Sequence, residues 1–118
     1  MEIKTINIKK DFPPADVAVS LLEIEIETYS NSNVGVLKVI HGYGSHGIGG
    51  EIKHQLTKRL GELKKQCKIL DFIPGEKFGE TQKNNQYILQ NFPALIIDSD
   101  LSLYNSGITL IFLNNKNK

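Results

Sequence analysis

The sequence has 118 residues, of which 40% are hydrophobic and 23% are charged, a composition typical of one soluble globular domain and not of disordered, collagen-like or coiled-coil chains. Fourteen basic and thirteen acidic residues leave a formal net charge of +1, so total charge does not indicate a nucleic-acid partner. The longest apolar runs, 94–97 and 110–113, are far shorter than the roughly 20 residues that cross a bilayer, and Cys67 has no second cysteine to pair with. We therefore expect a cytoplasmic protein without a membrane partner.

The first predicted elements are a strand and an acidic helix. Alternating β-branched residues predict a half-buried strand over 3–8. Asp11 precedes two prolines, which helices tolerate in their first turn, so it is predicted to cap a helix over about 14–28. Residues 22–27 also alternate as a strand would. Helical spacing predicts that this helix buries one face, made of Val17, Ala18, Leu21, Leu22 and Ile24.

The middle of the chain predicts a buried strand, a loop and the clearest helix. Residues 34–40 are apolar and rich in β-branched side chains, with only Lys38 charged. Residues 41–50 contain five glycines, a density of backbone freedom that packed elements do not tolerate. A helix over about 50–66 follows, with an apolar face made of Ile52, Leu56, Leu60, Leu63 and Cys67.

The last third contains two predicted strands separated by a long insertion. The strands are 68–73 and 107–113, and the insertion covers about 75–106. Its first part, to residue 85, is polar and is predicted to be mobile. Residues 86–91 suggest a short helix, and 94–97 suggest either a short strand or a buried connector. The tail 114–118 is predicted to fray, which leaves a single domain over 1–113.

This order of elements predicts an α/β (α+β) two-layer sandwich. It contains a mixed four-stranded sheet in the chain order β-α-β-α-β-insert-β, with the last strand beside the third and both helices on one face. Loops that follow parallel strands share one edge of such a sheet, where open α/β sheets bind ligands. We therefore expect Lys9 and Lys10, the loop 41–50 and the exit 71–75 to converge there.

Charge is distributed unevenly around this loop. Residues 11–27 carry five acidic and no basic side chains, whereas 38–68 carry seven basic and two acidic ones, so an anion would favour the second segment. Backbone N–H groups of a glycine loop before a helix can bind phosphate. The P-loop pattern fails because Ile48-Gly49 follows where Lys-Ser or Lys-Thr is needed. Gly42-x-Gly44-x-x-Gly47 matches the dinucleotide fingerprint, with Asp71 as a ribose-binding acid, and stays an alternative.

A third interpretation comes from a family resemblance. Val-Ile-His-Gly-Tyr-Gly-Ser at 39–45, a glycine spacer and the amphipathic helix over 52–63 resemble the central motif of the Smr (small MutS-related) domain, an apolar strand that runs into His-Gly-x-Gly with a helix behind it. The resemblance covers 3–73 and 107–113, including a C-terminal Gly-Ile-Thr strand. Smr domains bind DNA or RNA, and some nick or cleave them, so the resemblance implies a nucleic-acid partner.

The resemblance also implies roles for the loop residues. His41 is the candidate catalytic residue, as a general acid/base or a phosphate donor, and the amides of Gly42, Gly44 and Ser45 would hold the phosphate. Independently of the resemblance, Tyr43 at the tip of the loop either stacks on a base or is an exposed or locally packed tyrosine. The complete set of expected nucleic-acid contacts is Lys9, Lys10, Gly42, Tyr43, Gly44, Ser45, Gly47, Lys53 and Lys58.

One departure from the family pattern weakens the case for catalysis. The family's first strand usually carries Leu-Asp-x-His-Gly, and here Asn7, Lys9 and Lys10 stand at its acid, histidine and glycine. A lysine with an ordinary pKa near ~10.4 binds phosphate but does not accept a proton at neutral pH. Endonuclease activity is therefore expected to be weak or lost. His46 is expected to be a solvated loop histidine, and the alternative is that it substitutes for the missing histidine.

Other polar residues are expected to have no special role. His54 lies on the polar face of the second helix, and Asp71, Asp98 and Asp100 are expected to be separate surface acids unless the insertion folds back to gather them around a metal. No His/Cys cluster has zinc spacing, and no cofactor is expected. A protein-interaction module stays a further alternative.

Overall fold

The computed structural model describes residues 2–11, 13–42, 48–79, 89–92 and 105–115, together with Leu95, Asp98, Leu101 and Leu103. Its elements in chain order are β1 (Glu2–Asn7), α1 (Ala15–Ser30), β2 (Val34–Ile40), α2 (Ile48–Lys65), β3 (Ile69–Pro74), the 3-10 helix η1 (Gly75–Lys77) and β4 (Ile108–Leu113). No helix in the described part of the chain is long and apolar enough to cross a membrane.

The four strands form one mixed sheet in the spatial order β1-β2-β4-β3. β1 runs parallel to β2, and β4 runs antiparallel to both β2 and β3. The last strand therefore lies beside the third, as predicted, and it also separates β3 from β2. This central place suits β4 because all six of its residues are buried.

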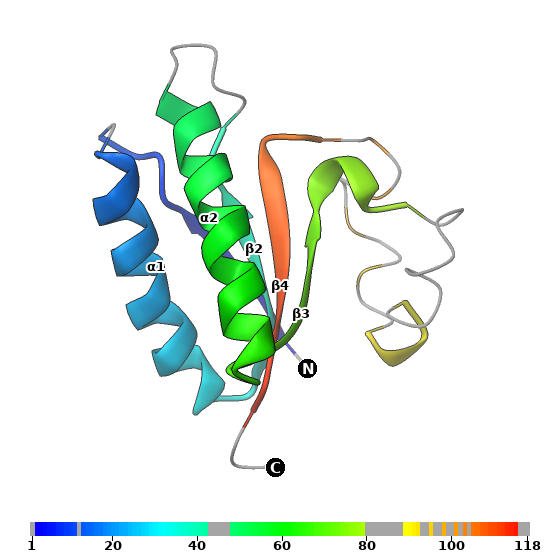
Figure 1. Cartoon of the computed structure of the whole chain (residues 1–118). Coiled ribbons are helices and arrows are strands. Elements are labelled where there is room, and N and C mark those ends of the chain that lie inside the picture. Colours follow the sequence, from blue (N-terminus) through cyan, green and yellow to red (C-terminus); the bar gives the residue numbers. More distant parts are fainter. Residues whose placement is uncertain are drawn as a thin grey trace.

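Both helices cover one face of the sheet, so the predicted two-layer sandwich is confirmed (Figure 1). The core between the layers combines the apolar faces of α1 and α2 with side chains from all four strands. An ion pair between Arg59 of α2 and Glu23 of α1, with Nη2 and Oε1 2.7 Å apart, joins the two helices at the surface.

A second apolar cluster covers the opposite face of the sheet. The insertion supplies five of its members, which pack on β2, β3 and β4: Phe78, Leu89, Phe92, Leu95 and Leu101. Residues 89–91 are helical, as expected for part of 86–91, and Leu95 is fully buried in a 3-10 turn. The insertion therefore closes the core on this face. Residues 80–88, which include most of the segment predicted to be mobile, lie outside the described part of the chain.

The structure corrects the predicted packing of α1. Ala18 and Leu22 are buried, but Val17, Leu21 and Ile24 are 43%, 55% and 62% exposed. The sequence contains two adjacent apolar stripes on this helix, and only the stripe through Ala18 and Leu22 faces the sheet. Pro14 occupies the position before the helix, without a side-chain cap, so Asp11 does not cap it.

Cys67 is also corrected from core to surface. α2 ends at Lys65, and Cys67 is exposed with a φ of 60°. The amide of Lys68 donates to the carbonyl of Leu63, and the amide of Cys67 donates to that of Lys64, both at 3.0 Å. These are the bonds of a Schellman motif, with cysteine at the left-handed position that glycine usually occupies.

Cys67→Gly is expected to stabilise the protein by about 1 kcal/mol, because glycine adopts a left-handed conformation without the steric cost that a Cβ atom brings. Urea unfolding monitored by circular dichroism measures the change. Cys67→Ala removes the thiol but keeps the Cβ atom, so it should leave stability nearly unchanged. An equal gain in both variants would contradict the backbone explanation.

The first tail residues are ordered, against the prediction of fraying from residue 114. The side-chain amide of Asn114 donates to the carbonyl of Cys67 at 2.8 Å, and that of Asn115 donates to the carbonyl of Val34 at 2.9 Å. These bonds satisfy carbonyls beyond the end of α2 and at the start of β2. Residues 116–118 lie outside the described part of the chain.

Candidate functional site

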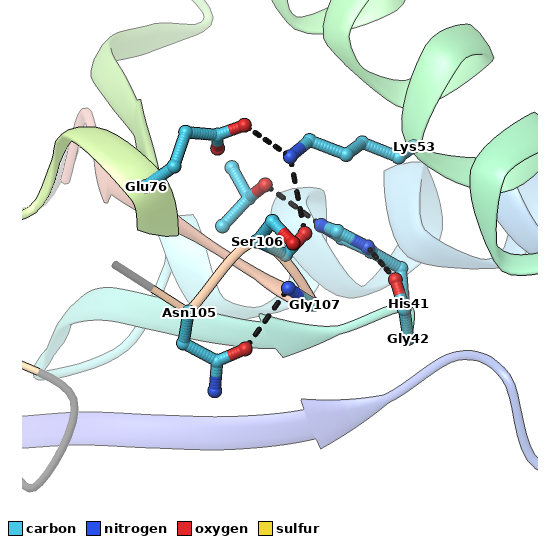
Figure 2. Close-up of polar contacts among 8 residues, drawn as sticks. His41, Gly42, Lys53, Glu76, Asn105, Ser106 and Gly107 are labelled. Atoms are coloured by element: carbon cyan, nitrogen blue, oxygen red, sulfur yellow. Dashed lines mark hydrogen bonds and ion pairs between the residues drawn. The ribbon is translucent and has the colours of Figure 1, made fainter. Parts of the chain in front are cut away.

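The ends of three strands converge at one edge of the sheet, as predicted from the chain order. Because β1, β2 and β3 are mutually parallel, their C-terminal ends meet the N-terminal end of β4 there. His41 follows β2, Glu76 follows β3, and the turn through Ser106 precedes β4 (Figure 2).

His41 is fully buried, with an exposed fraction of 0%, and both of its ring nitrogens are engaged. Nδ1 lies 3.0 Å from the carbonyl oxygen of Gly42, and Nε2 lies 3.0 Å from the hydroxyl oxygen of Thr109 on β4. A carbonyl only accepts, so Nδ1 carries a proton, and in the neutral ring Nε2 accepts from the hydroxyl of Thr109. Desolvation by burial lowers the pKa of His41, against the raising effect of the Gly42 carbonyl, and nearby Lys53 lowers it further. The ring is therefore neutral in the folded protein at neutral pH.

The neutral state of His41 predicts how stability depends on pH. Below its ordinary pKa of 6.5 the histidine is protonated in the unfolded chain, whereas the folded protein keeps it neutral to lower pH. The unfolded state then binds more protons, so stability decreases as the pH falls below about 6.5, by at most about 1.4 kcal/mol per pH unit. Urea midpoints measured across this range should show the decrease in wild type.

Two variants test whether His41 causes this dependence of stability on pH. His41→Asn cannot be protonated and should lose the component that begins near pH 6.5, although it is less stable throughout. His54→Gln is the control because His54 is exposed on α2, and it should keep the wild-type profile. A profile unchanged by His41→Asn would exclude a buried neutral ring.

Gly42 turns the chain away from β2 with a φ of +83°, a conformation that favours glycine. Its amide and that of His41 both donate to the carbonyl of Gly107, each at 3.0 Å. The sequence predicts that the Gly42 amide holds a phosphate. In the structure this amide is instead used inside the fold, in its bond to Gly107. Gly42 instead joins the start of the glycine loop to the start of β4.

Lys53 reaches across from α2 to Glu76, which follows β3, and to the turn before β4 (Figure 2). Its ammonium forms an ion pair with the carboxylate of Glu76 and donates to the carbonyl of Ser106 at 3.0 Å. Desolvation would raise the pKa of Glu76, but the bond from Lys53 holds it below its usual value. Glu76 is therefore ionised and compensates the charge of Lys53.

A hollow of about 230 Å³ lies beside Gly42, on the sheet face opposite the helices. Its lining comes from the ends of β1 and β2 and from the turn before β4: Thr5, Lys9, Lys38, Ile40, Gly42, Asn105, Gly107 and Ile108. The side chain of Lys9 passes close to Gly42, where an added Cβ would be 3.1 Å from Lys9 Cδ. Within the described residues, Lys9 has no carboxylate partner, so a positive charge borders this hollow.

The other expected contacts are not gathered at the hollow. Lys10 lines a groove between β1 and α1, and Lys58 lines one between the outer sides of α1 and α2. Residues 43–47 lie outside the described part of the chain, which leaves the expectations for Tyr43, Gly44, Ser45, His46 and Gly47 open. The described basic residues therefore border several separate surfaces.

Asp71 and Asp98 are separate, but only Asp71 is the surface acid that the sequence predicts, because the side chain of Asp98 is only 11% exposed. Asp71 pairs with Lys64 at 3.0 Å, and Asp98 pairs with Lys38 at 2.8 Å on the opposite face of the sheet. No group of three or more metal-ligating side chains occurs among the residues with described positions. Asp100 lies outside them.

Sequence reasoning missed the partners that hold the site together. Glu76 stood in a segment that looks merely polar, and its role depends on contact with Lys53, 23 positions earlier. The Gly-Ile-Thr sequence at 107–109 contributed to the family resemblance, but its bonds to His41 depend on β4 pairing with β2. Comparison of the chain with protein-family models, curated proteins and solved structures finds no match.

Proposed function

We propose that this protein is a Smr-like domain that binds the phosphate groups of DNA or RNA at the edge where β1, β2 and β3 end. The hollow beside Gly42 carries the proposal, because Lys9 borders it without a carboxylate partner among the described residues. The hollow also adjoins the point where the glycine loop leaves β2. An uncompensated ammonium beside a concave surface attracts anions, and phosphate contacts supply most non-specific affinity for nucleic acids.

The contributions of the other residues differ from those first expected. Lys53 is compensated by Glu76, so its charge adds little to the attraction of an anion. His41 acts as a positioning residue, because its bond to the Gly42 carbonyl directs the chain into the glycine loop. A general base needs a free ring nitrogen within reach of the substrate, and His41 is enclosed with both nitrogens engaged. The proposed activity is therefore binding rather than strand cleavage.

A dinucleotide site receives less support from the same geometry. In that fingerprint the first turn must let the pyrophosphate approach the backbone at the helix N-terminus. Here the amide of Gly42 already donates to the carbonyl of Gly107. Gly42 also lies close to Lys9 on the sheet face opposite α2, and not at the N-terminus of that helix. No observation among the described residues favours a nicotinamide cofactor over a phosphate backbone.

Lys9→Gln is expected to weaken nucleic-acid binding and to reduce its salt dependence. Removing one phosphate contact lowers the slope of log affinity against log salt by about 0.7–0.9. Fluorescence anisotropy with labelled single-stranded, duplex and branched DNA and a structured RNA, each over a series of salt concentrations, measures both quantities.

The control is Lys65→Gln, at the far end of α2 from this edge. It removes the same charge and should have a smaller effect than Lys9→Gln. Equal losses in the two variants would place binding elsewhere. If wild type shows no salt-sensitive binding to any of the four probes, the proposed function is wrong, and NAD binding in calorimetry would support the dinucleotide alternative instead.

A further inference from the structure

An exposed apolar stripe of α1, made of Val17, Leu21 and Ile24, lies beside the edge strand β1. β1 is an edge strand that pairs only with β2, and its other side has no strand partner among the described residues. Five large hydrophobic residues are exposed in the described part of the chain. Three of them lie on α1 (Val17, Leu21 and Ile24), and one, Leu70, lies on β3, the other edge strand. A groove of about 310 Å³ separates α1 from β1, with a lining that includes Ile6, Ile8, Leu21 and Ile24. Exposed apolar side chains beside unpaired backbone are typical of an interaction surface.

We propose that a second copy of this chain occupies this surface, so that β1 pairs antiparallel with β1 of the partner copy about a twofold axis at Thr5. Such an isologous contact joins two four-stranded sheets into one continuous sheet. It also covers both grooves and both apolar stripes at once.

The direction of the backbone groups on β1 restricts this pairing to registers in which the twofold axis passes through a residue and not between two residues. The amides of Glu2 and Ile8 donate to the carbonyls of Asn33 and Ile40, so the even-numbered residues of β1 face β2. The N–H and C=O groups of the odd-numbered residues Ile3, Thr5 and Asn7 therefore point to the open side, because these groups alternate along a strand. A twofold axis at Thr5 places Thr5 opposite Thr5 and Ile3 opposite Asn7. Every outward group then has a partner, since opposed residues of this kind exchange two hydrogen bonds.

Charge favours the same register. An axis at Lys4 would place two lysines directly opposite each other, which destabilises a strand pair. With the axis at Thr5, Lys4 of one copy instead stands opposite Ile6 of the other. Ile6 and Glu25 line the same groove, so the incoming ammonium meets a carboxylate there and its aliphatic stem covers an apolar side chain. The groove is thus complementary to the strand that would occupy it.

The oligomeric state and its response to two pairs of variants test the proposal. Sedimentation equilibrium over a concentration series should show wild type in a reversible monomer–dimer equilibrium. Thr5→Pro removes the outward N–H but no bond to β2, and it should weaken the dimer about a hundredfold, whereas Thr5→Ala keeps the N–H and should retain the dimer. Circular dichroism checks that both variants fold.

The second pair tests the apolar stripe without affecting the core. Leu21 and Leu70 are both 55% exposed, on α1 and on the opposite edge strand. Leu21→Lys should weaken the dimer at least about tenfold, and Leu70→Lys should leave it unchanged. A wild type that stays monomeric at all concentrations overturns the proposal, including the case in which its β1 edge captures an extended peptide instead. So does a dimer that resists both Thr5→Pro and Leu21→Lys.

Disulfide trapping tests the register in a Cys67→Ser background. Thr5→Cys places two cysteines across the axis at a Cα separation of about 5.5 Å, within the range of a disulfide. Lys4→Cys places them more than about 7 Å apart, beyond that range. Oxidation should therefore trap the Thr5→Cys dimer and not the Lys4→Cys dimer, and the reverse result would overturn the assigned register.

Discussion

Gly75→Ala is expected to destabilise the protein by about 3 kcal/mol or more, through a steric clash with backbone atoms. A Cβ at Gly75 would lie 1.9 Å from the carbonyl oxygen of Asn105 and 2.6 Å from Ile108 Cγ1. The carbonyl belongs to the turn before β4, which cannot retreat without disturbing the strand between β2 and β3. Glycine is thus required here for close approach of two chain segments. Thermal and urea unfolding measure the loss.

Gly61→Ala is the matched control for this substitution. Gly61 lies within α2, and a Cβ there would have nothing within 4 Å. Alanine has a higher helix propensity, so this variant should be about 1 kcal/mol more stable than wild type. If stability falls in Gly75→Ala and rises in Gly61→Ala, the space around each glycine decides the sign of the change in stability. A loss below 1 kcal/mol in Gly75→Ala would contradict the close approach at the exit of β3.

Asp98→Ala is expected to cost about 3 kcal/mol, because it breaks a largely buried ion pair. The ammonium of Lys38 on β2 and the carboxylate of Asp98 in the insertion are 2.8 Å apart, and each side chain is only 11% exposed. Removing this carboxylate takes away the partner at 2.8 Å from an ammonium whose side chain is only 11% exposed. Urea unfolding of the single variant measures the cost.

Two further variants separate burial from charge. Asp71→Ala removes the partner of Lys64 in a pair whose side chains are 50% and 40% exposed, and it should cost less than about 1 kcal/mol. The double variant Lys38→Met/Asp98→Leu replaces both charges with apolar groups of similar size and should recover most of the stability lost in Asp98→Ala. Equal costs for Asp98→Ala and Asp71→Ala would contradict this explanation.

The elements of this fold could be predicted from local patterns. The strand over 34–40 matches β2 because its residues are continuously apolar, and the helix over about 50–66 matches α2 within two residues because four leucine and isoleucine side chains repeat at helical spacing. The chain order also predicted the edge at which the strand ends meet. Cys67 was misassigned because apolar periodicity continues past the residue at which the backbone leaves the helix.

The candidate site was predictable only in part. The sequence identified His41 and Lys9, and it placed them at the same edge of the sheet. It did not reveal that His41 would be buried against Thr109, or that Glu76 would compensate Lys53, because each of these contacts joins residues more than 20 positions apart. Such pairs depend on strand order, and local patterns contain no information about which strand lies between two others.

The sequence by itself determined the type and order of the elements, the apolar faces available for burial and the convergence of parallel strand ends. Only the tertiary structure decided which of two apolar stripes on α1 faces the sheet, that β4 lies between β2 and β3, and that the insertion returns Asp98 to Lys38. The physical reason is that periodicity arises from contacts between near neighbours along the chain. Which of several apolar surfaces is buried depends instead on how all the layers pack together. In a close-packed interior, each side chain excludes water and other side chains from the space that it fills.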